Sequence, residues 1–335
     1  MRRIMKYVMA GTLCFVMAAM FCSGCSKKES SLTKVTLNEV AHSIFYAPQY
    51  VAIENGYFEE EGIDIELVTG FGADKTMAAV VAGEADVGFM GAESSVYMYG
   101  EGAENYVVNF AQLTQRAGNF LVAREPIENF TWDMLKGKDV LGGRKGGMPE
   151  MVFEFILKKN NIDPVMDVKI NQSIDFGSTA AAFSGGQGDY TVEFEPSATA
   201  LEQAGEGYVV ASLGVDSGYV PYTSYCVTKK YLEHNEDIIQ KFTNALQKGM
   251  DYVNTHTPEE IAAVIAPQFE ETDEETIELI VTRYHEQDTW KDNLVFEEDS
   301  FDLLQSILDA AGELSEKTPY EKLVNSDYAK EAAEK

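Results

Sequence analysis

The sequence predicts an α/β protein whose chain forms two lobes, and three observations carry this prediction. From Lys34 onward, short apolar runs alternate with helical segments, a pattern typical of βαβ units with a mostly parallel sheet and helices on both faces. The alternation breaks near residues 116–119 and then resumes, which divides the βα units into two blocks. After Tyr225, one strand is followed by almost continuous amphipathic helix. A chain of 335 residues is long enough for two packed cores.

The individual elements follow from residue periodicity and from helix start and stop signals. Strands are predicted where apolar residues alternate or run together, at 34–40, 63–70, 87–91, 105–113, 120–125, 138–143, 168–174, 189–196, 208–215 and 224–229. Helices are predicted at 48–55, 75–82, 131–137, 149–160, 178–186 and 197–205.

The C-terminal helical part carries two predicted capping boxes, Thr257 with Glu260 and Thr272 with Glu275. The acidic run at 269–278 is therefore interpreted as a solvated helix start rather than as a cation site.

The N-terminus has the organisation of a secretory signal. Arg2, Arg3 and Lys6 precede an apolar stretch that ends in small residues, and this stretch is short for a membrane span. The ending Cys-Ser-Gly-Cys resembles a bacterial lipobox, which implies lipidation of Cys25 after removal of residues 1–24. Residues 25–33 would then be a tether, and two acyl chains would anchor the protein stably on the extracytoplasmic side of the cell membrane.

Cysteine use and charge exclude several classes of protein. After loss of the signal and lipidation of Cys25, the remaining cysteine is Cys226, which is expected to be a small core residue of an apolar strand. It can form neither an intramolecular disulfide nor a structural zinc site. The chain has 55 acidic and 26 basic residues, a formal net charge of −29, which argues against nucleic acid and anionic membrane surfaces as partners.

Four motifs carry a resemblance to a known family. FYAPQYVAIENGYFEEEGIDIEL at 45–67 and MAAVVAGEADVGFMG at 77–91 resemble the signature of the NitT/TauT binding proteins, which take nitrate, taurine, alkanesulfonates and thiamine-pyrimidine precursors. DMLKGKDV at 133–140 and GQGDYTVEFEP at 186–196 match later parts of the same pattern.

The resemblance implies a type II periplasmic binding protein fold: two doubly wound lobes joined by two crossover strands that act as a hinge. Lobe 1 would comprise 34–120 plus 223–335, and lobe 2 would comprise 121–222. It further implies an extracytoplasmic receptor, expected to be monomeric, that closes on a small molecule and delivers it to the permease and ATPase of an ABC importer.

Ligands of doubly wound sheets bind beyond the carboxyl ends of the strands, and this rule selects the candidate residues. The glycines there permit close backbone approach, and the aromatic residues could stack on a flat ligand or fill the lobe cores. The predicted ligand-binding residues are Ser43, Tyr46, Phe71, Gly72, Ala92, Glu93, Thr114, Arg144, Lys145, Gly146, Glu193, Glu195 and Tyr222.

The charges among these residues bear on the kind of ligand. Glu193 and Glu195 would lie on one side of a strand and, with Glu93, would oppose a small anion and suit the N–H donors of a nitrogen heterocycle. Arg144 and Lys145 could instead clamp an anionic group. We expect a nitrogen heterocycle of the thiamine-pyrimidine or flavin kind, with taurine, an alkanesulfonate or nitrate as the alternative.

Two other function classes remain open. An enzyme branch of the same fold makes the thiamine pyrimidine with a cysteine-rich, iron-binding segment, but the four histidines here (42, 234, 256 and 285) have no metal-ligand spacing. The sequence also has no cysteine-rich motif, no Gly-x-Ser-x-Gly and no His-Glu-x-x-His. We therefore expect no catalytic residue, metal or cofactor, and we interpret His42 as a polar contact or a structural hydrogen bond. A receptor that reports to a signalling partner would have the same sequence features.

The stretch GGRKGGMPE at 142–150 could be mistaken for a phosphate loop. Gly142 and Gly147 have the Walker separation, but Met148 and Pro149 stand where Lys and Ser or Thr are required. The stretch is instead predicted to be a strand-to-helix turn with Pro149 at the first helical position. Its two cations are expected to be either ligand contacts or partners of acids across the lobes.

Overall fold

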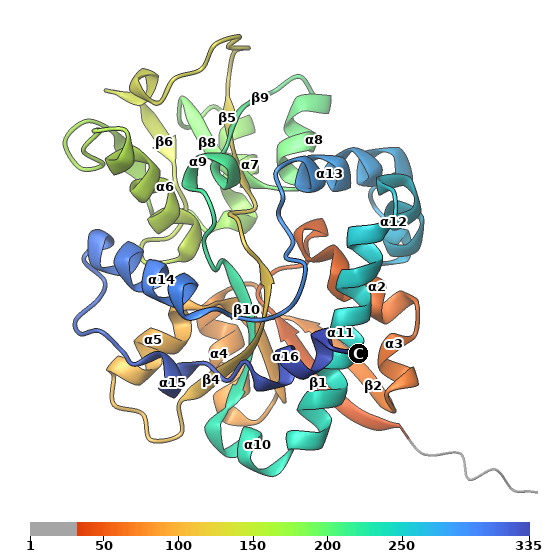
Figure 1. Cartoon of the computed structure of the whole chain (residues 1–335). Coiled ribbons are helices and arrows are strands. Elements are labelled where there is room, and N and C mark those ends of the chain that lie inside the picture. The colour runs from red at the N-terminus through yellow and green to blue at the C-terminus, as the bar shows by residue number, and fades with distance from the viewer. Residues whose placement is uncertain (1–31) are drawn as a thin grey trace, which may run out of the picture. The chain divides into compact units, whose positions relative to one another are not determined.

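The computed structural model describes residues 32–335, of which residues 33–335 form one compact unit (Figure 1). Its first sheet has five strands in the order β2-β1-β3-β10-β4. Strand β10 runs antiparallel to both of its neighbours, whereas β1 is parallel to β2 and β3. The strands are β1 (Thr33–Glu39), β2 (Ile63–Thr69), β3 (Val87–Gly91), β4 (Val107–Thr114) and β10 (Thr223–Thr228).

Short helices connect the strands of this sheet, as the alternation of the sequence predicts. Helix α2 carries proline in its first turn, where the missing N–H costs nothing. The elements are η1 (Ile44–Tyr46), α2 (Ala47–Glu54), α3 (Tyr57–Glu60), α4 (Ala73–Ala82) and α5 (Glu93–Gly100).

The second sheet repeats the arrangement of the first in the order β7-β6-β8-β5-β9, with β5 antiparallel to β8 and β9. Its strands are β5 (Asn119–Ala123), β6 (Asp139–Leu141), β7 (Lys169–Asn171), β8 (Tyr190–Phe194) and β9 (Tyr208–Ser212). Its helices are η2 (Trp132–Leu135), α6 (Met148–Lys159), α7 (Phe176–Ser184), α8 (Ser197–Gln203) and α9 (Leu213–Ser217).

The chain passes between the sheets twice, from β4 to β5 and from α9 to β10. The lobe boundaries 34–120 plus 223–335 and 121–222 stay a proposal drawn from the sequence, and β5 of the second sheet begins at Asn119, two residues before the proposed boundary. After β10 the chain is helical: α10 (Lys229–His234), α11 (Glu236–Thr255), α12 (Pro258–Ile265), η3 (Ala266–Gln268), α13 (Glu274–Glu286), α14 (Glu298–Ala311), α15 (Tyr320–Leu323) and α16 (Asp327–Ala333).

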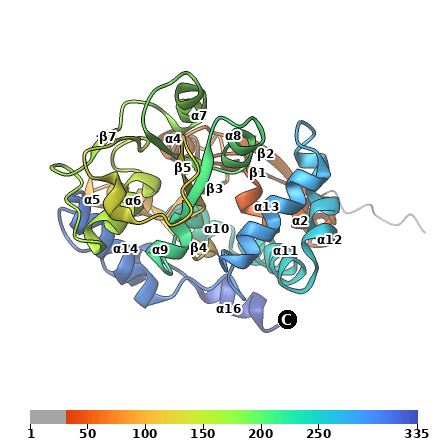
Figure 2. The ribbon, with the colours of Figure 1, turned by 90° about the horizontal axis from the view of Figure 1, so that it is seen from above.

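The C-terminal helices contact elements that belong to both sheets. Helix α11 packs on α2 and α3, and α16 packs on α11 and β4. Helix α14 lies beside α5 and also beside α6, as two views of the ribbon show (Figures 1 and 2). The helices after β10 therefore pack on the elements around the first sheet and also connect them to helix α6 of the second sheet.

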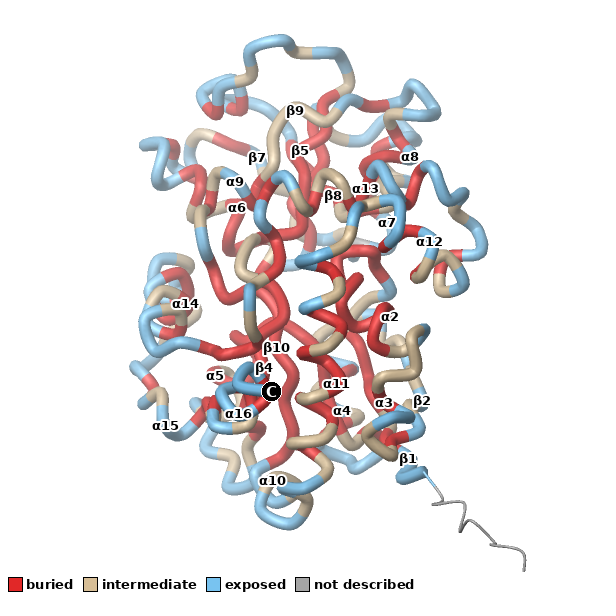
Figure 3. The backbone as a smooth tube through the Cα atoms, turned by 45° about the vertical axis from the view of Figure 1, so that its right-hand side comes forward, coloured by how far each residue is buried: buried red, intermediate tan, exposed pale blue. Residues whose placement is uncertain are grey.

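The core runs through the middle of both sheets. Strands β3, β4, β5 and β10 are buried along their whole length (Figure 3). One cluster of buried apolar side chains includes Val35 and Phe89 of the first sheet and Leu121 and Val192 of the second. The hydrophobic driving force therefore holds both sheets in one packed body.

Most sequence-based predictions of elements are confirmed, including the Thr257–Glu260 capping box. The Thr272–Glu275 box is wrong: Asp273 caps α13 and accepts a hydrogen bond from the Thr276 N–H at 2.9 Å. A carboxylate one residue later offers a charged acceptor to the same helix turn.

Pro149 is the second residue of α6, not the first. Cys226 is buried, as predicted.

Gly249 provides a test of the contact between α11 and α2. A Cβ atom at Gly249 would lie 2.2 Å from the Pro48 carbonyl oxygen, so Gly249→Ala should destabilise the protein by about 2 kcal/mol. The matched control is Gly177→Ala in α7, where no atom lies within 4 Å, and it should be neutral or slightly stabilising. Urea denaturation measures both, and similar values for the two variants would contradict the packing described.

Candidate functional site

The carboxyl ends of the first-sheet strands meet the second sheet at a tightly packed junction. Ser43, which caps η1, donates from Oγ to the Glu195 carbonyl oxygen at 2.9 Å. The Phe45 ring lies 6.1 Å from the Phe194 ring and 5.7 Å from the Tyr222 ring, measured between centroids. Gly118 lies against Phe45, where a Cβ atom would be 2.6 Å from the ring. The junction therefore has little room for larger side chains.

Glu93 is a buried acid near Tyr46 and Tyr222. It begins α5 directly after β3, and only 3% of the residue is exposed. Its Oε2 atom is buried and has no hydrogen-bond partner in residues 32–335. Burial raises the pKa of Glu93 to about 7, an effect that the N–H groups of Glu93 and Met148 partly offset. Glu93 thus offers a buried acceptor that changes charge near neutral pH.

The crossover strands supply a polar cluster next to Glu93. The Tyr222 hydroxyl donates to Asn119 Oδ1 at 2.5 Å, and the Asn119 Nδ2 atom is buried without a partner in the described part of the chain. Thr114 Oγ1 and Thr223 Oγ1 share a hydrogen bond of 2.6 Å. Burial raises the pKa of Tyr222, and the Glu93 charge raises it further, so the two groups are electrostatic neighbours.

Tyr46 also belongs to this cluster. It is 2% exposed, and its ring packs edge-on against Phe89 with 4.5 Å between centroids. Burial, then the charges of Glu39 and Glu93, raise the pKa of its hydroxyl. The structure therefore brings together five of the predicted residues: Ser43, Tyr46, Glu93, Thr114 and Tyr222. Asn119 was not among the predicted residues, although its position directly after the break in the alternation could have suggested it.

The other two predicted acids are occupied by protein partners. Glu193 accepts hydrogen bonds from Thr191 Oγ1 at 2.5 Å and from Thr179, and burial raises its pKa to about 7. The Glu195 carboxylate accepts from the Thr199 N–H and Oγ1, both at 2.9 Å, and from Arg283 at 2.8 Å. Glu195 follows the end of β8, so the two-residue period of the strand does not extend to it.

The predicted cations pair with acids other than Glu93, Glu193 and Glu195. Arg144 lies 3.2 Å from Asp74, and Lys145 lies 3.5 Å from Glu313. Gly146, in the same loop, accepts a hydrogen bond from the Tyr97 hydroxyl at 2.9 Å. The predicted residues 144–146 therefore bridge to elements around the first sheet.

The remaining predicted residues lie in two loops. Ala92 is buried just before α5. Phe71 and Gly72 follow β2, and both have positive φ values, +56° and +146°. The Phe71 side chain is 75% exposed, so it does not belong to the buried cluster. A left-handed conformation at a bulky residue is uncommon and costly.

His42 has a structural role, which was one of its two predicted roles. Its Nδ1 atom is 2.8 Å from Glu39 Oε1, and its Nε2 atom is 2.7 Å from the Gln268 carbonyl oxygen. The hydrogen bond to Glu39 raises the pKa of His42 against the effect of burial. Glu39 is fully buried and also accepts hydrogen bonds from Gln49 and Tyr50, each at 2.8 Å.

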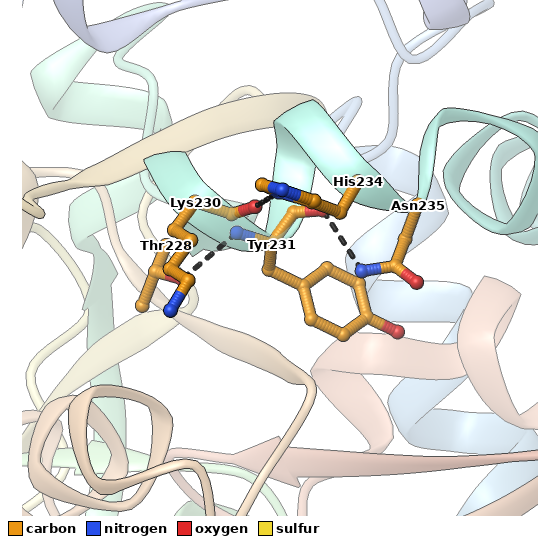
Figure 4. Close-up of a pocket in the computed structure, with 5 residues that line it drawn as sticks. All are labelled: Thr228, Lys230, Tyr231, His234 and Asn235. Atoms are coloured by element: carbon orange, nitrogen blue, oxygen red, sulfur yellow. Dashed lines mark hydrogen bonds between the residues drawn. The ribbon is translucent and has the colours of Figure 1, made fainter.

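A separate cavity of about 240 Å³ lies beside α10 (Figure 4). Three local hydrogen bonds link its lining residues: Thr228 accepts from the Tyr231 N–H, His234 bonds to the Lys230 carbonyl, and Asn235 donates to the Tyr231 carbonyl. We do not assign it as the solute site. It is lined by Thr228, Lys230, Tyr231, His234 and Asn235.

The described residues contain neither a metal-ligating cluster nor a helix that could span a membrane. Within residues 32–335, no group of three or more His, Cys, Asp or Glu side chains is arranged to hold a metal ion. Over the same residues, no helix is long and apolar enough to span a bilayer. The predicted signal at 1–24 and the lipidation site Cys25 lie outside the described residues.

Solved structures of solute-binding proteins have the same fold as this chain. The alkanesulfonate-binding protein SsuA from Xanthomonas axonopodis pv. citri, solved with bound MOPS, is 14% identical with a TM-score of 0.72, over 88% of this chain and 98% of that one. The periplasmic nitrate-binding protein NrtA from Synechocystis PCC 6803 is 16% identical with a TM-score of 0.72, over 91% and 89%. The fold is thus that of the type II periplasmic binding proteins, as predicted.

The sequence relationships are more specific. The profile of the family described as NMT1/THI5 like matches residues 44–261. A Bacillus subtilis (strain 168) protein, YtlA, described by its name as a candidate binding protein, is 46% identical over 310 residues, 92% of this chain and 93% of that protein. The chain belongs to the NMT1/THI5-like family, and the resemblance carried by residues 45–67 and 77–91 is confirmed.

Arg283 provides a test of the contact between α13 and the turn after β8. Because Arg283→Ala leaves the buried Glu195 carboxylate without its cation, we expect a loss of about 3 kcal/mol in the free energy of unfolding. The matched control is Lys241→Ala, which breaks an exposed pair with Asp237 within one helix and should cost less than about 0.5 kcal/mol. Equal losses in urea denaturation would show that the Arg283 pair is no stronger than a surface pair.

Glu93 makes stability depend on pH. Since its pKa is about 7 in the folded protein and 4.5 as a model group, the Glu93 contribution is fully present below pH 4.5 and is lost as pH rises to about 7. The full loss corresponds to about 3 kcal/mol. Glu93→Gln should therefore gain stability relative to the natural protein as pH rises from 4.5 to 7, measured by urea denaturation. A constant difference across this range would contradict the burial of an ionisable Glu93.

Proposed function

We propose that the chain is an extracytoplasmic solute receptor that closes its two sheets around a small molecule and delivers it to an ABC import permease and ATPase. The NMT1/THI5-like family, the fold shared with SsuA and NrtA, and the similarity to YtlA support this role. Two passages of the chain between the sheets are the connections that a hinge requires. Lipid anchoring at Cys25 and a monomeric state belong to the same proposal.

We propose further that the ligand is a nitrogen heterocycle of the thiamine-pyrimidine or flavin kind. The observation that carries this proposal is the unpartnered Oε2 atom of Glu93 in a buried junction. A ligand N–H or protonated ring nitrogen would satisfy it with a charge-assisted hydrogen bond, and burial strengthens such a bond. The unpartnered Asn119 amide would donate to an acceptor on the ligand, and the buried rings of Tyr46 and Tyr222 would supply aromatic contacts.

An anion such as a sulfonate or nitrate is the alternative, because SsuA and NrtA bear those ligands in their names. An ionised Glu93 would repel such a ligand. The cations that could neutralise it, Arg144 and Lys145, are paired with Asp74 and Glu313. The arrangement of charges therefore favours the heterocycle.

Binding without turnover agrees with the state of the reactive side chains. Burial in β10 raises the pKa of the Cys226 thiol to about 12, so it is not a nucleophile at neutral pH. His42 is held between Glu39 and the Gln268 carbonyl. We therefore propose a receptor rather than an enzyme.

A thermal-shift screen followed by calorimetry tests the ligand class. The panel comprises thiamine, aminopyrimidines, riboflavin, taurine, alkanesulfonates and nitrate, and a ligand at a hundred times its Kd adds about 2.7 kcal/mol of stability. We expect a heterocycle to bind with an affinity that rises as pH increases towards 7, because ionised Glu93 is the better acceptor.

In the same assay, Glu93→Gln should weaken heterocycle binding about 10-fold or more, since it replaces a charged acceptor. The exposed Glu233→Gln variant is the matched control and should bind like the natural protein. Binding of taurine or nitrate alone, with an affinity that falls as pH rises, would reject the heterocycle and identify an anion receptor.

A further inference from the structure

The loop at residues 142–147, between β6 and α6, is the glycine-rich stretch that does not match a phosphate loop. Gly143 and Gly146 have φ values of +78° and +77°, a conformation that glycine adopts without strain. These two glycines flank Arg144 and Lys145. The backbone thus turns sharply on both sides of two consecutive cations and presents them away from the second sheet's own strands.

Three elements from around the first sheet contact this loop. Asp74 of α4 pairs with Arg144, and Glu313, just after α14, pairs with Lys145. Tyr97 of α5 donates to the Gly146 carbonyl at 2.9 Å and lies 3.4 Å from the Met151 sulfur in α6. By the proposed lobe boundaries, each of these four contacts joins the second-sheet region to the first-sheet region, so all four break if the sheets separate.

The loop is also fixed to its own side. Glu150 of α6 is 2% exposed, and its Oε2 atom accepts from the Gly146 N–H at 3.2 Å. Its Oε1 atom accepts from Gln172 at 2.5 Å. The loop therefore moves together with α6 and the second sheet.

We propose that Arg144 and Lys145 form an electrostatic latch between the two sheets and are positioning residues rather than ligand contacts. The latch, defined as the pairs Arg144–Asp74 and Lys145–Glu313, stabilises the closed arrangement and slows loss of the solute. A formal net charge of −29 makes the two halves repel each other, and the latch places two cations where they face acids of the other half. This inference rests on the proposed hinge closure but not on the identity of the ligand.

Both pairs are largely exposed, which sets their expected strength. Exposed ion pairs are individually weak, so the two together should shift an opening equilibrium by about two- to tenfold. Salt screens them, since the screening length falls from about 30 Å at 0.01 M to about 3 Å at 1 M. The two ion pairs are therefore strong enough to shift the equilibrium towards the closed arrangement and weak enough to break when the sheets separate.

The test is single-molecule fluorescence transfer on the ligand-free protein, with dyes on Glu84→Cys and Val165→Cys, two exposed positions in the two halves. We expect Arg144→Ala with Lys145→Ala to shift the population towards the open state by about two- to tenfold at low salt. The same variant should show almost no shift at about 1 M salt. The charge swap Arg144→Asp with Asp74→Arg should restore most of the closed population.

Lys241→Ala is the control, because its exposed pair with Asp237 lies within α11 and does not join the two halves. A double variant that behaves like this control, or a natural protein whose closed population is independent of salt, would overturn the latch. A large loss of heterocycle affinity without any change in the ligand-free equilibrium would also overturn it and would make the cations ligand contacts. Since the measurement uses no ligand, it can fail while the proposed receptor function stands.

Discussion

One constraint dominates this molecule: a carboxyl group is buried where the two sheets meet. Glu93 is held at the start of α5 by the strand before it, and its Oε2 atom is left without a partner among the described residues. A buried carboxylate with one unpartnered oxygen is costly, so burial raises its pKa even though the N–H groups of Glu93 and Met148 offset part of the effect. The same group therefore lowers the stability of the free protein at neutral pH, and in the proposed receptor it would favour a solute that can donate a hydrogen bond.

The other acids around the junction are neutralised by dedicated partners. Glu39 is surrounded by donors from His42, Gln49 and Tyr50, and Glu195 is paired with Arg283. Gln49 and Tyr50 belong to α2, ten and eleven residues after Glu39, whereas Arg283 belongs to α13, 88 positions after Glu195, so each contact fixes a helix against a strand end. These acids are satisfied within the protein, which distinguishes them from Glu93 with its unpartnered Oε2 atom.

The alternation of apolar and helical segments was sufficient to predict the ten strands of the described residues and helices α2, α4, α6, α7 and α8, since each signal is local, but the short helices α3, α5 and α9 were not predicted. The antiparallel insertion of β5 and β10 and the shared order of the two sheets were not predicted, because strand pairing is not local and no sequence repeat marks it. For the candidate site, the rule on strand ends selected Glu93, Tyr46 and Tyr222, which the structure places near one another. It missed Asn119, and it could not show that Glu195 would be bound by Arg283, a residue 88 positions away.

The most direct test of the central claim is a carbon-13 NMR titration of the Glu93 side-chain carboxyl group, assigned by comparison with Glu93→Gln, with and without a bound heterocycle. We expect a pKa of about 7 in the free protein and a clearly lower pKa in the complex, because the ligand's donor stabilises the carboxylate. A pKa near 4.5 in the free protein, or one that rises when the ligand binds, would contradict this expectation.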